Sequence, residues 1–99
     1  MADYTITLSK HATLIATTVD SVTITEKRFD AVEVTNRDGA AEIYYTIDGS
    51  TPAVGADNTW VLPAAVSSRV HDAAGDGNVK VELISAGTPK YSVSKVPQS

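Results

Sequence analysis

Apolar and polar residues alternate along most of this chain, as they do in β-strands that bury one face. The segments with this alternation are 4–8, 13–17, 21–25, 31–35, 42–47, 59–63, 68–71, 79–84 and 91–96. They are rich in Val, Ile and Thr, whose branched side chains suit a pleated surface. Apolar residues almost nowhere recur at three- and four-residue spacing for the ~10 residues that a helix needs. The pattern therefore predicts an all-β protein.

A tight turn is expected at residues 36–39, which contain the Asn, Asp and Gly that tolerate positive φ. This turn predicts a hairpin between residues 31–35 and 42–47. Tyr45 and the isoleucines two positions before and after it should face the core, and Tyr44 should point to the opposite side.

A second turn is expected at residues 86–89, which contain Gly and Pro. It predicts a hairpin between residues 79–84 and 91–96 at the end of the chain. Trp60 is the largest apolar side chain, and we expect it to pack against the core.

About seven or eight short antiparallel strands, separated by turns in a chain of 99 residues, predict an immunoglobulin-like β-sandwich. A small barrel is the alternative with the same pattern. The length fits one core, and the sequence has no internal repeat or linker. We therefore expect a single domain over residues 1–99, with residues 1–12 as a candidate extended arm.

The charge and the ends of the chain narrow the classes of partner. The net charge is −4, and the eight Lys and Arg residues are not clustered, which argues against nucleic acid as a partner. The first residues lack the basic and apolar stretches of a signal peptide, and no apolar run approaches ~18 residues. We therefore expect no membrane partner and folding in the cytoplasm. The absence of cysteine excludes disulfides and thiolate metal sites.

The sequence offers little for catalysis. His11 and His71 are the only histidines, and both are expected at the surface. No nucleophile elbow, phosphate-binding glycine loop or zinc-binding histidine pair occurs. We predict a protein that is not an enzyme and needs no cofactor.

Two polar loops raise the question of calcium, which prefers several oxygen ligands. Asp48 and Ser50 fall in one loop, and Asp72, Asp76 and Asn78 fall in or beside another. The spacing does not match an EF-hand, and the same residue types are common in tight turns. The turn interpretation is favoured, and a metal site remains the alternative.

Aromatic side chains could also provide a platform for sugar. Tyr44, Tyr45, Trp60 and Tyr91 are the aromatic residues concerned. Core packing is the favoured role for Tyr45 and Trp60, which leaves Tyr44 as the better candidate for a surface contact.

Residues 43–52 resemble the signature of the chitobiase C-terminal family of immunoglobulin-like β-sandwiches. The segment reads Ile-Tyr-Tyr-Thr-Ile-Asp-Gly-Ser-Thr-Pro. The resemblance implies a sandwich, because its turn residues have structural reasons to recur.

Four segments together resemble small virion proteins of tailed bacteriophages, which include head decoration subunits. These segments are residues 34–39, 43–52, 58–63 and 81–93. The resemblance implies an accessory virion protein and transfers no catalytic or binding residue.

These observations lead to the hypothesis of a capsid decoration or cement subunit that folds in the host cytoplasm and ends in the virion. Its partners would be the major capsid protein and neighbouring copies of itself. The candidate partner contacts are Tyr4, Tyr44, Asp48, Ser50, Asp76 and Asn78. The alternatives are a carbohydrate-binding or cell-surface module, with glycan contact, and a tail or neck subunit.

Overall fold

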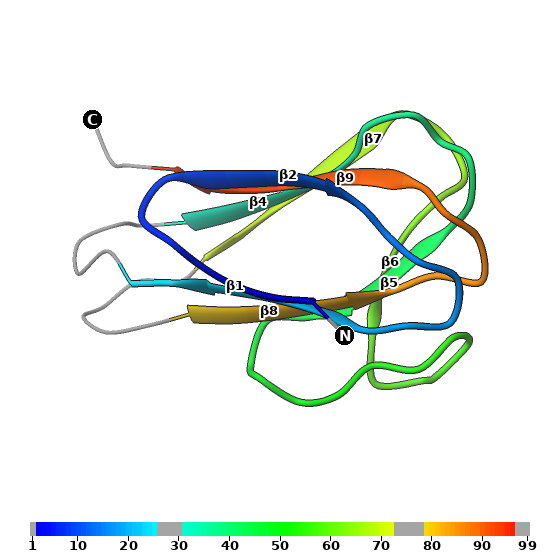
Figure 1. The fold of residues 1–99 in the computed structure, drawn as a ribbon, viewed down its shortest axis with the longest axis horizontal. Helices are drawn as coiled ribbons and strands as arrows, with labels where there is room; N and C mark the ends of the chain where they lie inside the picture. The colour runs from blue at the N-terminus through cyan, green and yellow to red at the C-terminus, as the bar shows by residue number, and fades with distance from the viewer. Residues whose placement is uncertain (1, 26–30, 73–78, 97–99) are drawn as a thin grey trace.

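The computed structural model describes residues 2–25, 31–72 and 79–96, and within them nine strands form two packed sheets (Figure 1). The strands are β1 (Ala2–Ile6), β2 (Ser9–Thr13), β3 (Asp20–Ile24), β4 (Ala31–Asn36), β5 (Ile43–Thr46), β6 (Trp60–Leu62), β7 (Ser67–Asp72), β8 (Val79–Ile84) and β9 (Lys90–Val96). One sheet has the order β1-β3-β8-β5-β6 and the other β2-β9-β4-β7. The predicted all-β sandwich is confirmed. The described residues form nine strands instead of seven or eight, and β1 pairs with β3 in parallel.

The core lies between the sheets and is made by the alternate positions that the sequence pattern marks. Its fully buried members are Leu14, Val22, Ile24, Val32, Val34, Ile43, Tyr45, Leu62, Val81, Leu83, Tyr91 and Val93. Burying one such side chain contributes about 1.5–3 kcal/mol, so these residues dominate the stability of a domain without disulfides. Tyr45 and Tyr91 are the largest of them, and the predicted core position of Tyr45 is confirmed.

The predicted hairpin between β4 and β5 is wrong, because the two strands lie in opposite sheets. The buried side chain of Asn36 explains the crossing. Its Nδ2 donates to the carbonyls of Ala41 and Pro63, both at 2.9 Å, and its Oδ1 accepts from the backbone N–H of Gly39 at 3.0 Å. These bonds direct the chain across the sandwich instead of back along the same sheet.

The predicted hairpin between β8 and β9 is also wrong, for a similar reason. The Ser85 hydroxyl donates to the carbonyl of Glu42 at 2.6 Å, which ties the start of this connection to the loop before β5. At its end, the backbone N–H of Lys90 donates to Asp38 Oδ1 at 3.1 Å. The turn residues were identified correctly, but the turn joins two sheets.

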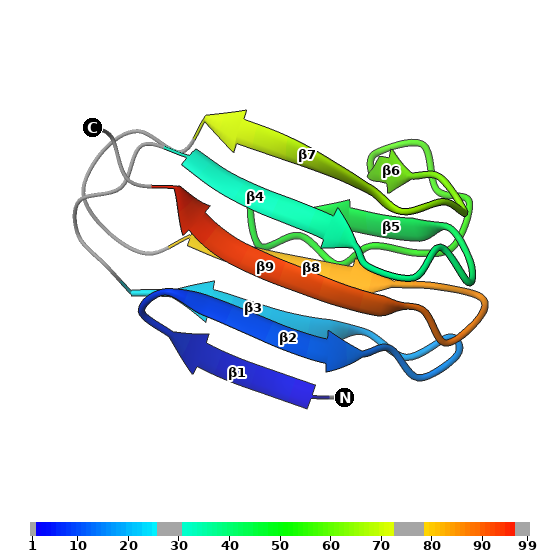
Figure 2. The same ribbon diagram turned by 90° about the horizontal axis from the view of Figure 1, so that it is seen from above.

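The N-terminal segment, a candidate arm from its sequence, forms β1 and β2, one at the edge of each sheet (Figure 2). The strand predicted at residues 13–17 lies at 9–13 instead, where every residue of β2 pairs with β9. Thr17 has a φ of 57°, and the N–H of Thr18 donates to the carbonyl of Ile15, so the chain turns where a strand was expected.

The sheet orders give the sandwich two different sides. β1 and β2 border one side, and β6 and β7 border the opposite side (Figure 2). Each of these strands has one neighbour within its sheet and one edge without a strand partner in the described part of the chain. Ligand or partner contacts can therefore differ between the two sides.

Candidate functional site

The long connection between β5 and β6 forms an open depression with a volume of about 760 Å³. Figure 1 shows this connection running on the outer side of the sheet that contains β8 and β5. The lining residues come from the two ends of the connection: Asp48, Ser50, Thr51, Ala56, Asp57, Asn58, Thr59 and Trp60. Seven of these eight residues carry a polar group on the side chain, counting the indole N–H of Trp60.

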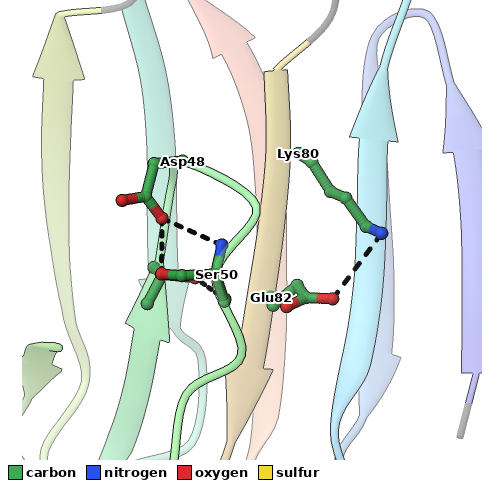
Figure 3. Close-up of polar contacts among 5 residues, drawn as sticks. Asp48, Ser50, Lys80 and Glu82 are labelled. Carbon is green, nitrogen blue, oxygen red and sulfur yellow. Dashed lines mark hydrogen bonds and ion pairs between the residues drawn. The ribbon is translucent and has the colours of Figure 1, made fainter. Parts of the chain in front are cut away.

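Hydrogen bonds within this connection hold its first turn in place. Asp48 Oδ1 accepts from the backbone N–H of Ser50 at 2.9 Å and from the Ser50 hydroxyl at 2.6 Å (Figure 3). These donors lower the pKa of Asp48, so this exposed carboxyl stays ionised. The Thr46 hydroxyl donates to the carbonyl of Ser50 at 2.5 Å. At the second end of the connection, the Thr59 hydroxyl donates to the carbonyl of Ala56 at 2.8 Å.

Trp60 lies at the surface, with 46% of the residue exposed, so the prediction that it packs in the core is wrong. β6 has three residues and lies at the edge of its sheet, where no further described strand covers the indole. Two side chains of β7 support the indole ring instead. The His71 ring lies 4.6 Å from it between centroids, and the Arg69 guanidinium lies 5.5 Å from its centroid.

His71 is buried, with 7% of the residue exposed, which contradicts the expected surface position. Its Nε2 lies 2.6 Å from the hydroxyl oxygen of Tyr45 and forms a hydrogen bond. Burial raises the pKa of Tyr45 to about 12, so the phenol keeps its proton near neutral pH. The histidine thus has a polar partner inside the sandwich and an aromatic cover formed by Trp60.

We predict that the stability of the fold decreases as the pH falls below the ordinary His pKa of 6.5. Burial, aided by the charge of Arg69, lowers the pKa of His71 in the folded protein. Above pH 6.5 the His71 ring is neutral in both the folded and the unfolded chain. Below pH 6.5 the ring of the unfolded chain binds a proton, whereas the lowered pKa keeps the ring of the folded chain neutral for longer, and this difference favours unfolding. Urea unfolding at about pH 7.5 and about pH 5 would measure the difference.

His71→Gln keeps a hydrogen-bonding side chain and should flatten this dependence, whereas His11→Gln, at an exposed position, should retain it. An unchanged slope in the His71 variant would contradict the assignment. The carboxyl groups of Asp38 and Asp48 also have a lowered pKa, but their contribution is lost only as the pH falls below 3.8.

The other predicted contact residues are dispersed. The Tyr4 ring lies on the β1–β2 side, with Lys10 Nζ at 4.1 Å from its centroid. Tyr44 is half-buried, and its hydroxyl donates to Glu42 Oε1 at 3.0 Å, which raises the pKa of Tyr44. Asp76 and Asn78 lie outside the described residues. The structure therefore brings only Asp48 and Ser50 together at the depression.

Thr51, Asp57, Asn58 and Trp60 complete the site. None of them is among the predicted partner contacts, although Trp60 was considered for an aromatic platform and then assigned to the core. The signal that would have found them is the length of the connection between two predicted strands and its high content of Asp, Asn, Ser and Thr.

A second polar group lies next to the depression on the outer face of the sheet. The Lys80 ammonium lies 3.7 Å from Glu82 Oε1 (Figure 3). Glu82 is buried, and its Oε2 has no hydrogen-bond partner among the described residues. The hydroxyl of Ser21 also has none, although Ser21 lies opposite Glu82 in the register of β3 and β8. Gly49 approaches Lys80 closely enough that an added Cβ would lie 3.9 Å from Lys80 Cδ.

The described residues contain no group of three or more His, Asp or Glu side chains placed to hold a metal ion. No helix in this part of the chain is long and apolar enough to cross a membrane. The arrangement at the depression can accept and donate hydrogen bonds and offer an aromatic surface. That chemistry suits binding.

Comparison with one solved structure supports the fold. The pre-peptidase C-terminal domain of a collagenase from Bacillus anthracis superposes with a TM-score of 0.58 at 11% identity, covering 95% of this chain and 92% of that one. PliG of Salmonella Typhimurium, a periplasmic inhibitor of g-type lysozyme, gives a TM-score of 0.49 at 13% identity, covering 97% and 98%. No curated protein sequence matches this chain.

Family membership rests on a sequence match to the core of the sandwich. The matching model is described as Fn3 associated, and the match covers residues 32–93, from the second residue of β4 into β9. The match includes the depression and most of the core, and the chain belongs to the Fn3-associated family.

Proposed function

We propose that this chain is a non-catalytic structural subunit of a tailed-phage virion, of the head decoration kind. It would fold in the host cytoplasm and dock on the major capsid protein beside further copies of itself. The resemblance of its sequence to small virion proteins motivates the proposal. The observation that carries it is the β1–β2 side of the sandwich, where one edge of each sheet has no strand partner among the described residues.

Free strand edges suit attachment to a shell. The outer edges of β1 and β2 present backbone N–H and C=O groups that an extended segment of a partner can pair with. Two exposed apolar side chains flank β2, since Leu8 is 59% exposed and Ile15 is 65% exposed. Such contacts are weak one by one, but the symmetry of a capsid repeats them over many subunits.

Leu8→Asp is expected to weaken binding to empty phage heads at least about tenfold, because it places a charge where an apolar side chain would be buried. The measurement is co-sedimentation of the purified protein with empty heads of the phage that encodes it. Val66→Asp is the matched control, since Val66 is 72% exposed and lies beside β7 on the opposite side. Point changes are preferable to deleting β1, because Tyr4 and Ile6 of that strand pack against the core.

Saturable binding at a copy number related to capsid symmetry would support a decoration role. Binding to purified tails but not to heads would replace it with a tail or neck role. Equal binding by the Leu8 and Val66 variants would exclude the β1–β2 side as the docking surface.

A further inference from the structure

We infer that the depression beside Trp60 is a binding site for neutral carbohydrate. It lies next to β6, on the side of the sandwich opposite β1 and β2. A subunit attached through β1 and β2 would leave this site open, so the inference does not depend on attachment to a shell. Three observations carry the inference. Polar side chains of the depression have no partner among the described residues, the Trp60 ring is held by its neighbours, and the charged lining residues are acidic.

The polar groups at the depression are available to a ligand. Asp48 uses Oδ1 to hold Ser50, and Figure 3 shows its second oxygen turned away from Ser50. The side chains of Asp57 and Asn58 are exposed and make no hydrogen bond or ion pair with another described residue. Carboxylates accept hydrogen bonds from hydroxyl groups, and an amide both accepts and donates, which is what a sugar ring with several hydroxyls requires.

Trp60 supplies the apolar component at the same place. The C–H faces of a pyranose ring are apolar, and an indole that is nearly half exposed offers a flat surface for them. His71 and Arg69 contact this ring, so its orientation is supported before a ligand arrives. A site held in its binding geometry loses less entropy on association. The volume of about 760 Å³ lies within the range of known small-molecule sites, roughly 300–1,000 Å³.

The charge of the lining selects neutral ligands. Asp48 and Asp57 are both acidic, and no Lys or Arg is among the described lining residues. The two nearby cations have other partners, since Lys80 lies 3.7 Å from Glu82 and the Arg69 guanidinium lies 5.5 Å from the centroid of the Trp60 ring. A phosphate or a sialic acid would be repelled, because like charges placed close together are unfavourable. A cation site is the other use of two carboxylates, but one oxygen of Asp48 is already occupied by Ser50, and the described residues supply no third acidic ligand.

Trp60 is the only tryptophan of the chain, so its fluorescence reports directly on the site. The experiment titrates the full chain with chitohexaose, cellohexaose and maltohexaose, with and without a chelator. Sialyllactose serves as the anionic control. We expect a saturable change in emission with at least one neutral hexasaccharide, a Kd between about 1 μM and 1 mM, no effect of the chelator and no response to sialyllactose.

Variants then separate binding at this site from binding elsewhere. Trp60→Ala and Asn58→Ala should each weaken binding at least about tenfold by calorimetry, and His11→Ala on β2 should leave it unchanged. Asn58 is exposed and without a partner among the described residues, so its variant tests the site even if the Trp60 variant does not fold. The inference is overturned if no neutral hexasaccharide binds, if Asn58→Ala binds normally, or if Ca²⁺ alone saturates the emission change without any sugar binding.

Discussion

Replacing Tyr91 with phenylalanine is expected to lower the free energy of unfolding by about 2 kcal/mol, although only one oxygen atom is removed. The Tyr91 hydroxyl donates to Asp20 Oδ2 at 2.9 Å, and the two residues are 0% and 2% exposed. Burial and this bond to the carboxyl raise the pKa of Tyr91, so the donor keeps its proton at any ordinary pH. Without it, Asp20 loses a hydrogen bond that water cannot readily replace. Urea unfolding followed by circular dichroism would measure the change.

Tyr44→Phe is the matched control, because its hydroxyl also donates to a carboxyl, that of Glu42 at 3.0 Å, but at the surface. Its removal should cost less than about 0.5 kcal/mol. A double-mutant cycle with Tyr91→Phe and Asp20→Ala should show that the two changes are not additive. Equal losses in the free energy of unfolding for the two tyrosine variants would mean that burial does not determine how much the hydrogen bond of Tyr91 stabilises the fold.

The positions and faces of most strands could be predicted from the sequence. In β3, β4 and β8 apolar and polar residues alternate along the sequence, and Val22, Val34 and Val81 are all fully buried as that pattern predicts. β2 was misplaced because Ser9–Thr13 has no strong alternation, and its strand state comes from pairing with β9. Tertiary pairing can override a weak local preference.

Which strands pair could not be predicted, because turn residues specify a change of direction and not the sheet that receives the next strand. Two hairpins were expected, and in both cases the chain crosses the sandwich. At the first crossing the deciding feature is Asn36, whose side chain binds Ala41 and Pro63. The contact with Pro63 spans 27 positions of sequence, and no local pattern encodes it.

The candidate site was partly predicted. Asp48 and Ser50 were selected from their turn chemistry, and they do form the first turn of the depression. Trp60 and His71 were assigned to the wrong environments, because hydrophobicity predicts burial only where a neighbour exists to cover the residue. β6 is an edge strand, so its tryptophan is exposed, while Tyr45 provides the polar partner that allows His71 to be buried.

Gly39→Ala is expected to lower the free energy of unfolding by about 3 kcal/mol, an effect as large as many core truncations. Gly39 has a φ of +67°, where a side chain costs about 1–2 kcal/mol. An added Cβ would also lie 2.7 Å from the Cα of Ala65, which is backbone and cannot rotate away. The chain must therefore shift, and the bond from the Gly39 N–H to Asn36 Oδ1 at 3.0 Å should weaken with it.

Gly55→Ala separates the two causes, because Gly55 has a similar φ of +75° but no atom within 4 Å of an added Cβ. Only the backbone cost of about 1–2 kcal/mol should appear there. Thermal unfolding of both variants beside the unmodified chain would give the comparison. The difference between the two losses of stability measures the close packing of the connection after β4 against the segment after β6. Asn36 of β4 also bonds to Pro63 of that segment, and this contact joins the two sheets. If both substitutions cost the same, that close packing contributes nothing, and the crossing between sheets must be stabilised by the hydrogen bonds of Asn36 alone.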